Sequence, residues 1–232
     1  RDFDYEKYGD DTYFAENAKL SVPITLQDVP NWGKIKYTPY ISAAINWDFD
    51  GINEENDDLS SPLFEIGQTI GTSRINWKNN FRTGISASTT QSFAYNLQTD
   101  TIIPGISGEL EMFKGFRHFG INSDFYAFAY LGSSKKIGDR LRGIRDDQYF
   151  NTDSGHGNEY ACKTPAAITG SVDLPVHIFT THFTKGKLLS KLNFELQMSP
   201  FVDFAFVYNK ATGTVFYYKD GFYAGGIEFL VF

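Results

Sequence analysis

The sequence predicts an all-β fold, an antiparallel transmembrane β-barrel of which these 232 residues form one part. Three observations predict it: apolar and polar residues alternate over long stretches, aromatic residues are abundant, and short turns alternate with long polar connections. The 22 Phe, 14 Tyr and 3 Trp make up 17% of the chain. Aromatic residues favour strands and form girdles at both edges of membrane barrels.

A transmembrane helix is not expected, because no apolar run approaches the roughly 20 residues that one requires. The mean hydropathy is −0.32. Only helices and closed barrels satisfy all their backbone hydrogen bonds in lipid. A membrane location for this chain therefore requires a barrel.

The alternation predicts about nine strands, many longer than the usual 5–6 residues and long enough for the about 9–11 residues that cross a bilayer. The predicted strands are 15–26, 34–48, 62–77, 80–96, 102–114, 118–131, 165–179, 188–208 and 222–232. In 80–96 one face carries Phe81, Ile85 and Phe93, whereas the other carries small and polar residues. Such a face suits a water-filled lumen better than a packed core.

The connections between these strands also fall into two kinds. Asn79–Asn80 and Lys114–Arg117 are predicted short turns, whereas 49–61 and 132–164 are long and polar. Short turns at one end and long loops at the other are typical of outer-membrane barrels. A soluble β-sandwich is the alternative, but its strands would be shorter and its inward faces large and aliphatic.

Composition and motifs exclude several classes of function. The net charge of −7 argues against nucleic-acid binding, and the single Cys162 allows no internal disulfide. The histidines are scattered without metal-ligand spacing, and neither a G-x-S-x-G elbow nor a P-loop is present. We therefore expect no enzymatic activity, no catalytic residue, no metal and no cofactor. A Ser-His-Asp set from distant positions keeps an outer-membrane phospholipase or protease open as an alternative.

The long connection 132–164 contains the charged run Gly138–Asp146. Connections of this length are usually functional or disordered, and a charge run is usually solvated. Within it, Leu141-Arg142-Gly143-Ile144 resembles the loop signature of the BamA/TamA surface-antigen superfamily. In that family the signature lies in the sixth extracellular loop, which folds back into the barrel.

Three later segments resemble the same family in order and spacing, so the resemblance covers about 130–232. They are Gly170–Pro175, Ser199–Ala205 and Tyr223–Phe229. The sequence departs from the family pattern at three positions. Ile144 replaces an aromatic residue, Asp173 replaces the usual Glu, and Ala205 stands where Gly is common.

The resemblance implies that Arg142 docks the loop inside the barrel. Alternation places Asp173 opposite Val172, and Asp203 opposite Val202, so both carboxylates are predicted to face the lumen. A lumen carboxylate removed from water needs a cation, and the arginine fork can bridge two acceptors. We predict that Arg142 pairs with Asp203 and Asp173, with Gly143 allowing a tight turn at the loop tip. The alternative is that all three are separate charges.

The resemblance further implies that 1–232 is an incomplete outer-membrane β-barrel domain without a POTRA domain. The family barrel has sixteen strands, so we expect early strands and the last two to lie outside these residues. It also implies an integral protein of the Gram-negative outer membrane that inserts β-barrel proteins or translocates proteins. The expected partners are the lipid bilayer, unfolded outer-membrane or secreted clients, periplasmic POTRA domains and accessory lipoproteins. Alternatives are a passive porin or substrate-specific channel, and a surface adhesin.

Overall fold

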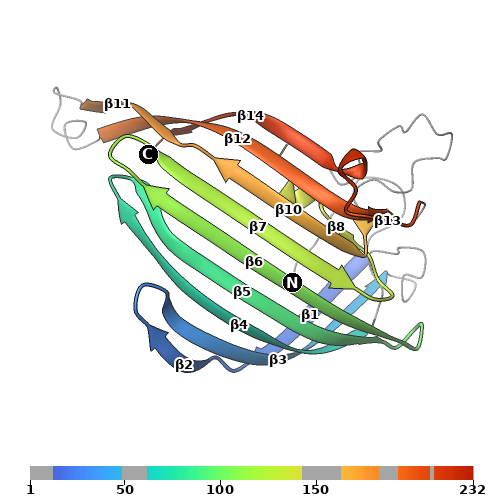
Figure 1. Cartoon of the computed structure of the whole chain (residues 1–232). Coiled ribbons are helices and arrows are strands. Elements are labelled where there is room, and N and C mark those ends of the chain that lie inside the picture. Colours follow the sequence, from blue (N-terminus) through green and yellow to red (C-terminus); the bar gives the residue numbers. More distant parts are fainter. Residues whose placement is uncertain (1–12, 49–61, 143–162, 183–192, 210–211, 232) are drawn as a thin grey trace.

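The computed structural model describes residues 13–48, 62–142, 163–182, 193–209 and 212–231, which fold almost entirely as strands (Figure 1). The strands are β1 (Tyr13–Ser21), β2 (Ile24–Val29), β3 (Gly33–Asp48), β4 (Leu63–Lys78), β5 (Phe81–Asn96), β6 (Thr101–Gly115), β7 (Gly120–Tyr130), β8 (Lys135–Lys136), β9 (Lys163–Thr164), β10 (Ala166–Asp173), β11 (Val176–His182), β12 (Asn193–Asn209), β13 (Thr214–Val215) and β14 (Phe222–Val231). Two 3-10 turns, η1 (Gly138–Arg140) and η3 (Tyr218–Asp220), complete the described elements. None of these described elements is a helix long and apolar enough to cross a membrane.

Twelve of the described strands form one antiparallel sheet, and β8 pairs separately with β9. β1 and β2 lie end to end along β3, while β10 and β11 lie end to end along β12. Strands that lie end to end are counted here as one row, and the short β13 pairs only with the end of β12. On this count the described sheet has nine long rows, the number of strands that the alternation predicts. The all-β antiparallel architecture is therefore confirmed.

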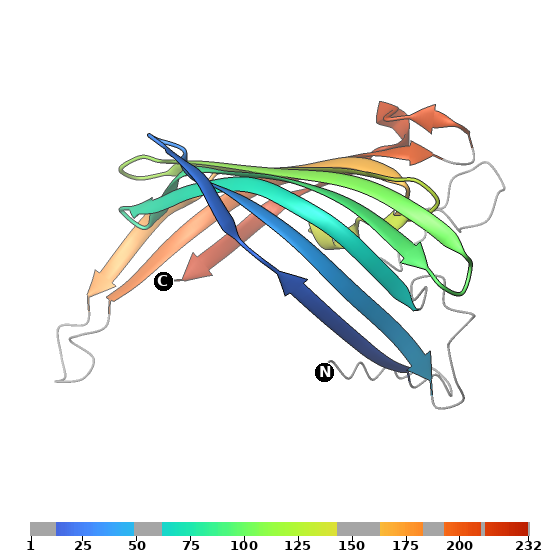
Figure 2. The same cartoon turned by 90° about the horizontal axis from the view of Figure 1, so that it is seen from below.

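The described rows do not close into a barrel. The row of β1 and β2 forms one edge and β14 the other, and each pairs on one side only within the described chain. Seen from below, the sheet curves into an arch with one concave and one convex face (Figure 2).

Two predicted strands, 15–26 and 165–179, are each broken by proline. Proline has no N–H to donate to a ladder. The first break, at Pro23, lies opposite Pro39 of β3, and the second, at Pro175, lies opposite Pro200 of β12. The residue before each break, Val22 or Leu174, still donates its backbone N–H to the facing proline carbonyl, at 3.1 and 3.0 Å. Each row therefore continues across its break.

One face of the sheet is apolar and exposed over many rows. Leu20, Ile41, Ile66 and Phe93 are direct register partners on β1, β3, β4 and β5, and each is more than half exposed. The far edge has the same character, with exposed Ile227 and Phe229 on β14. Strand parity produces this sorting, because side chains two residues apart point to the same side.

The opposite, concave face carries small and polar residues of β5, such as Ser88 and Thr90, which are register partners of Glu109 and Ser107 on β6. Phe81, predicted on the exposed apolar face with Phe93, is instead buried, at 2% exposure. The main buried apolar cluster of the described chain also lies on the concave face: Phe128, Ile137, Leu141, Ala167, Ala205 and Val207. Ile137 and Leu141 come from the segment after β7, and the other four come from the sheet. This segment lies under the arch (yellow-green in Figure 2). The connection therefore packs against the concave wall.

Aromatic rings on this sheet lie over glycines of the neighbouring strand. The register pairs are Tyr40 with Gly67, Tyr130 with Gly105, Phe204 with Gly170 and Phe201 with Gly226. A methyl group at Gly67 would come within 2.5 Å of the Tyr40 ring, and one at Gly105 within 2.3 Å of the Tyr130 ring. Glycine leaves space for a ring to lie flat on the sheet, and cross-strand pairs of this kind help to hold register.

The four connections named from the sequence separate as predicted. The turns at 79–80 and 116–119 lie at one end of the sheet, the second two residues later than predicted. The strand ends that 49–62 and 131–165 join lie at the other end. Asn79 and Asn80 both have positive φ, 51° and 61°, as the tightest hairpin turns require. Two other connections do not follow the rule. Only 97–100 joins β5 to β6 at the long-loop end, and 183–192 joins β11 to β12 at the short-turn end.

Candidate functional site: an arginine docked on the concave wall

The chain segment after β7 brings Arg142 to the wall. A 3-10 turn, η1, forms through hydrogen bonds from the Arg140 N–H to the Ile137 carbonyl and from the Leu141 N–H to the Gly138 carbonyl, both 3.0 Å. Ile137 is fully buried and Leu141 is 3% exposed. These two apolar anchors hold the turn against the sheet, and Arg142 follows directly.

Arg142 contacts Asp203 of β12 through three hydrogen bonds. Its backbone N–H and its Nε both donate to Asp203 Oδ2, at 2.9 and 3.0 Å, and its Nη2 donates to Oδ1 at 2.6 Å. Asp203 is only 1% exposed. A buried carboxylate requires a cation and hydrogen-bond donors, and the two-pronged guanidinium supplies both.

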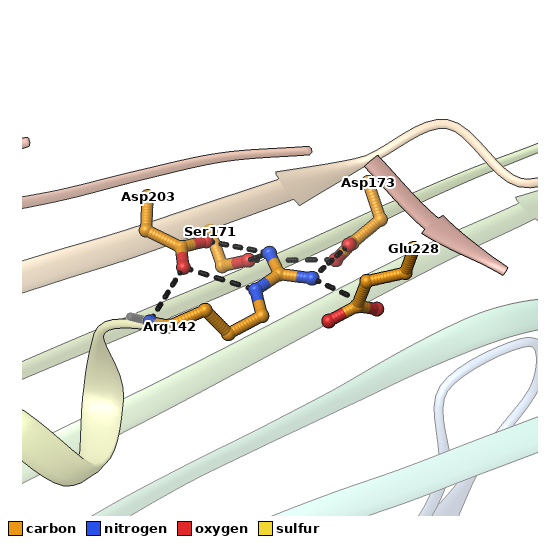
Figure 3. A network of polar contacts seen from close by, with 5 residues as sticks. All are labelled: Arg142, Ser171, Asp173, Asp203 and Glu228. Atoms are coloured by element: carbon orange, nitrogen blue, oxygen red, sulfur yellow. Dashed lines mark hydrogen bonds and ion pairs between the residues drawn. The ribbon is translucent and has the colours of Figure 1, made fainter. Parts of the chain in front are cut away.

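The other side of the guanidinium faces three more acceptors (Figure 3). Nη1 donates to Asp173 Oδ1 at 2.5 Å, and Nη2 donates to Ser171 Oγ at 2.7 Å, both on β10. Glu228 of β14 forms an ion pair with Nη1 at 3.3 Å. Together with the two side-chain contacts to Asp203, the hydrogen bonds to Asp173 and Ser171 occupy four of the five N–H donors of the guanidinium.

An aromatic ring on the concave wall completes the site. The Arg142 Cζ lies 3.6 Å from the centre of the Phe201 ring, a stacked cation–π contact. Phe201 can lie flat because its register partner is Gly226, where a methyl group would come within 3.0 Å of the ring. Gly226 thus shapes the surface on which Arg142 rests.

The electrostatics of the site hold Arg142 permanently charged. Hydrogen bonding to Asp203, and then to Asp173, raises the pKa of the Arg142 guanidinium against the opposing effect of its partial burial. One cation faces three carboxylates, those of Asp173, Asp203 and Glu228. With four donors hydrogen-bonded and its charge compensated, this guanidinium is suited to a tether between the loop and the wall and not to proton transfer.

The structure brings together Leu141, Arg142, Asp173 and Asp203, as the sequence predicted, and both aspartates face the concave side. The other two residues of the predicted loop motif, Gly143 and Ile144, lie outside the described residues.

Sequence reasoning did not assign a role to Ser171, Phe201, Gly226 or Glu228. The position of Ser171 and Phe201 could have been inferred, because each lies two residues from the predicted aspartate on its strand and therefore on the same face of the sheet. Glu228 and Gly226 lie on β14, and only the register between β12 and β14 places them beside Arg142.

The described residues contain no group of three or more His, Cys, Asp or Glu side chains that could hold a metal ion. Comparison of the chain with protein families, with curated proteins and with solved structures finds no match. The geometry of the docked arginine is therefore the main guide to function.

Proposed function

We propose that this chain is the barrel portion of an integral outer-membrane protein of the BamA/TamA type. Such a protein inserts β-barrel proteins into the outer membrane or translocates proteins across it. The observation that carries the proposal is the docking of Arg142, from a long loop, onto Asp203 and Asp173 of the concave wall. This is the arrangement that the family resemblance of the loop and the later strands implies.

The exposed apolar face supports the membrane part of the proposal. Soluble monomers rarely expose contiguous apolar patches larger than a few hundred Å². Here exposed aliphatic and aromatic residues run from β1 to β14 on one face, and the concave face carries the carboxylates that pair with Arg142. Strands β3 to β6 have 15 or 16 residues, more than the about 9–11 needed to cross a bilayer.

Adjacent residues on β6 provide a matched test of membrane insertion. Ile106 is 48% exposed on the apolar face, and Ser107 lies on the concave face. A lysine facing the middle of the lipid destabilises a barrel by about 2–4 kcal/mol, whereas one facing the lumen is tolerated. Ile106→Lys should therefore deplete the folded, membrane-integrated protein, and Ser107→Lys should leave its amount nearly unchanged. Equal tolerance of both changes would contradict a lipid-facing surface.

The assembly function is tested by depleting the full-length protein from its host. Loss of other outer-membrane barrels, measured by quantitative proteomics of isolated outer membranes, is the expected result. Selective loss of secreted proteins would assign translocation instead. Unchanged levels of both classes would contradict the proposal. POTRA domains encoded ahead of this segment and co-purifying lipoproteins are the expected partners.

A passive channel is the second candidate, and the polar concave face favours it. A channel lumen is polar, and inward loops constrict it. In this case depletion would change the uptake of small solutes and leave other membrane proteins unaffected. The tether at Arg142 favours the first candidate, because its residues and their spacing along the chain resemble those of the assembly family.

A further inference from the structure

A second arginine of the same loop segment has its own site on the wall. Arg140 Nη1 forms an ion pair with Glu109 Oε1 of β6 at 2.8 Å. The Arg140 Cζ also lies 4.1 Å from the centre of the Tyr126 ring on β7. Glu109 and Tyr126 are direct register partners, so the guanidinium rests on one cross-strand pair.

This site repeats the chemistry of the Arg142 site on different strands. Arg142 rests on the register pairs Ser171–Asp203 and Asp173–Phe201, so in both sites an arginine meets a carboxylate and an aromatic face. Leu141, between the two arginines, is buried in the apolar cluster. Three consecutive side chains therefore contact the wall.

The surroundings of Arg140 are acidic. On the concave face β6 carries Glu109 and Glu111, and Asp124 of β7 is the register partner of Glu111. Asp124 Oδ1 is buried and has no hydrogen-bond partner. Arg140 pairs with one of these three carboxylates and offsets the charge of the other two, since uncompensated like charges on neighbouring strands are destabilising.

We propose that Arg140 is a second, separable latch that positions the loop by tying it to β6 and β7, while Arg142 ties it to β10, β12 and β14. These five strands are consecutive rows of the sheet. The paired latches would hold the loop at two points and fix the curvature of the wall between them. The inference concerns loop position alone and does not depend on the proposed membrane function.

Cysteine labelling of the full-length protein tests the latch. Ile137, a residue of the loop segment that is fully buried against the wall, becomes the reporter as Ile137→Cys in a Cys162→Ser background. A maleimide reaches it only when the loop leaves the wall. Arg140→Gln should raise the labelling rate about fivefold, the effect of losing one half-exposed ion pair and one cation–π contact. Arg74→Gln is the matched control, because Arg74 is exposed on β4 and forms no ion pair with another described residue.

A second reporter separates local undocking from unfolding. Ser92 is 6% exposed on β5, a strand that Arg140 does not contact, and Ser92→Cys should label at the same slow rate with or without Arg140. The charge exchange Arg140→Glu with Glu109→Arg should return labelling at position 137 to within about twofold of the parent, whereas Arg140→Glu alone should not. Equal labelling of the Arg140→Gln and Arg74→Gln proteins, parallel increases at both reporters, or no rescue by the exchange would each overturn the proposal.

Discussion

Arg142→Gln should destabilise the protein strongly, because it leaves Asp203 buried without a cation. The substitution removes the side-chain hydrogen bonds of 3.0 and 2.6 Å to a carboxylate that is 1% exposed. Removing one partner of a buried pair costs about 3–5 kcal/mol. The Arg142 side chain is 29% exposed, and its backbone N–H still donates to Asp203 at 2.9 Å. We therefore expect a smaller loss of stability than for a fully buried pair, about 2–3 kcal/mol.

The double-mutant cycle isolates the pair. Asp203→Asn removes the buried charge and leaves Arg142 with Asp173 and Glu228, so its cost should be about 1–2 kcal/mol. Once Asp203 is neutral, loss of the guanidinium should matter less. The double variant should therefore be more stable than the sum of the single effects predicts, by about 1–2 kcal/mol.

Urea titration of the full-length protein in detergent measures these differences, with the folded fraction read from the mobility of unheated samples on gels. Arg74→Gln, an equal loss of charge at an exposed position, serves as the control and should change stability by less than about 0.5 kcal/mol. Additivity of the two single variants within about 0.5 kcal/mol would show that Arg142 and Asp203 act independently, and the reasoning above would fail.

Three further predictions can be tested in the same titration. Gly226→Ala should lower stability by about 1–3 kcal/mol, because the new methyl group would lie 3.0 Å from the Phe201 ring on which Arg142 rests. Gly225→Ala is the control and should be nearly neutral, because its methyl group would lie only 3.4 Å from a carbonyl oxygen. Similar losses of stability in the two variants would contradict a role for the ring. Gly84→Ala should disrupt the β4–β5 hairpin, since φ is +138° and the new methyl group would lie 1.9 Å from the Arg74 carbonyl oxygen, while Gly108→Ala, with its nearest atom at 3.6 Å, should fold normally. Arg142→Lys should retain less than half of the Arg142–Asp203 coupling energy, because an ammonium group cannot make the two-pronged contact; full retention would mean that charge alone docks the loop.

The parity of the strands could be predicted from the sequence with good accuracy. The inward direction of Asp173 and Asp203 followed from period-two alternation, which depends only on neighbouring residues. The two proline breaks were missed, although Pro23 and Pro175 stood in the predicted strands. Alternation continues across a single break and therefore hides it.

The register of the strands could not be predicted, and it decides which residues share the site. The register of β14 on β12 pairs Glu228 with Ser199, which places Glu228 beside Arg142. The same register pairs Gly226 with Phe201 and so leaves room for the Phe201 ring. Arg140 was seen in the sequence only as part of a charge run. Its partner Glu109 lies 31 positions earlier, on a strand without any family motif.

The sequence by itself therefore determined the strands, their two faces and the loop that carries Arg142, because alternation and turn chemistry are local properties of the chain. The tertiary structure alone decided which carboxylates and rings converge on each arginine. That choice depends on register and curvature, which arise from contacts between residues far apart in the sequence.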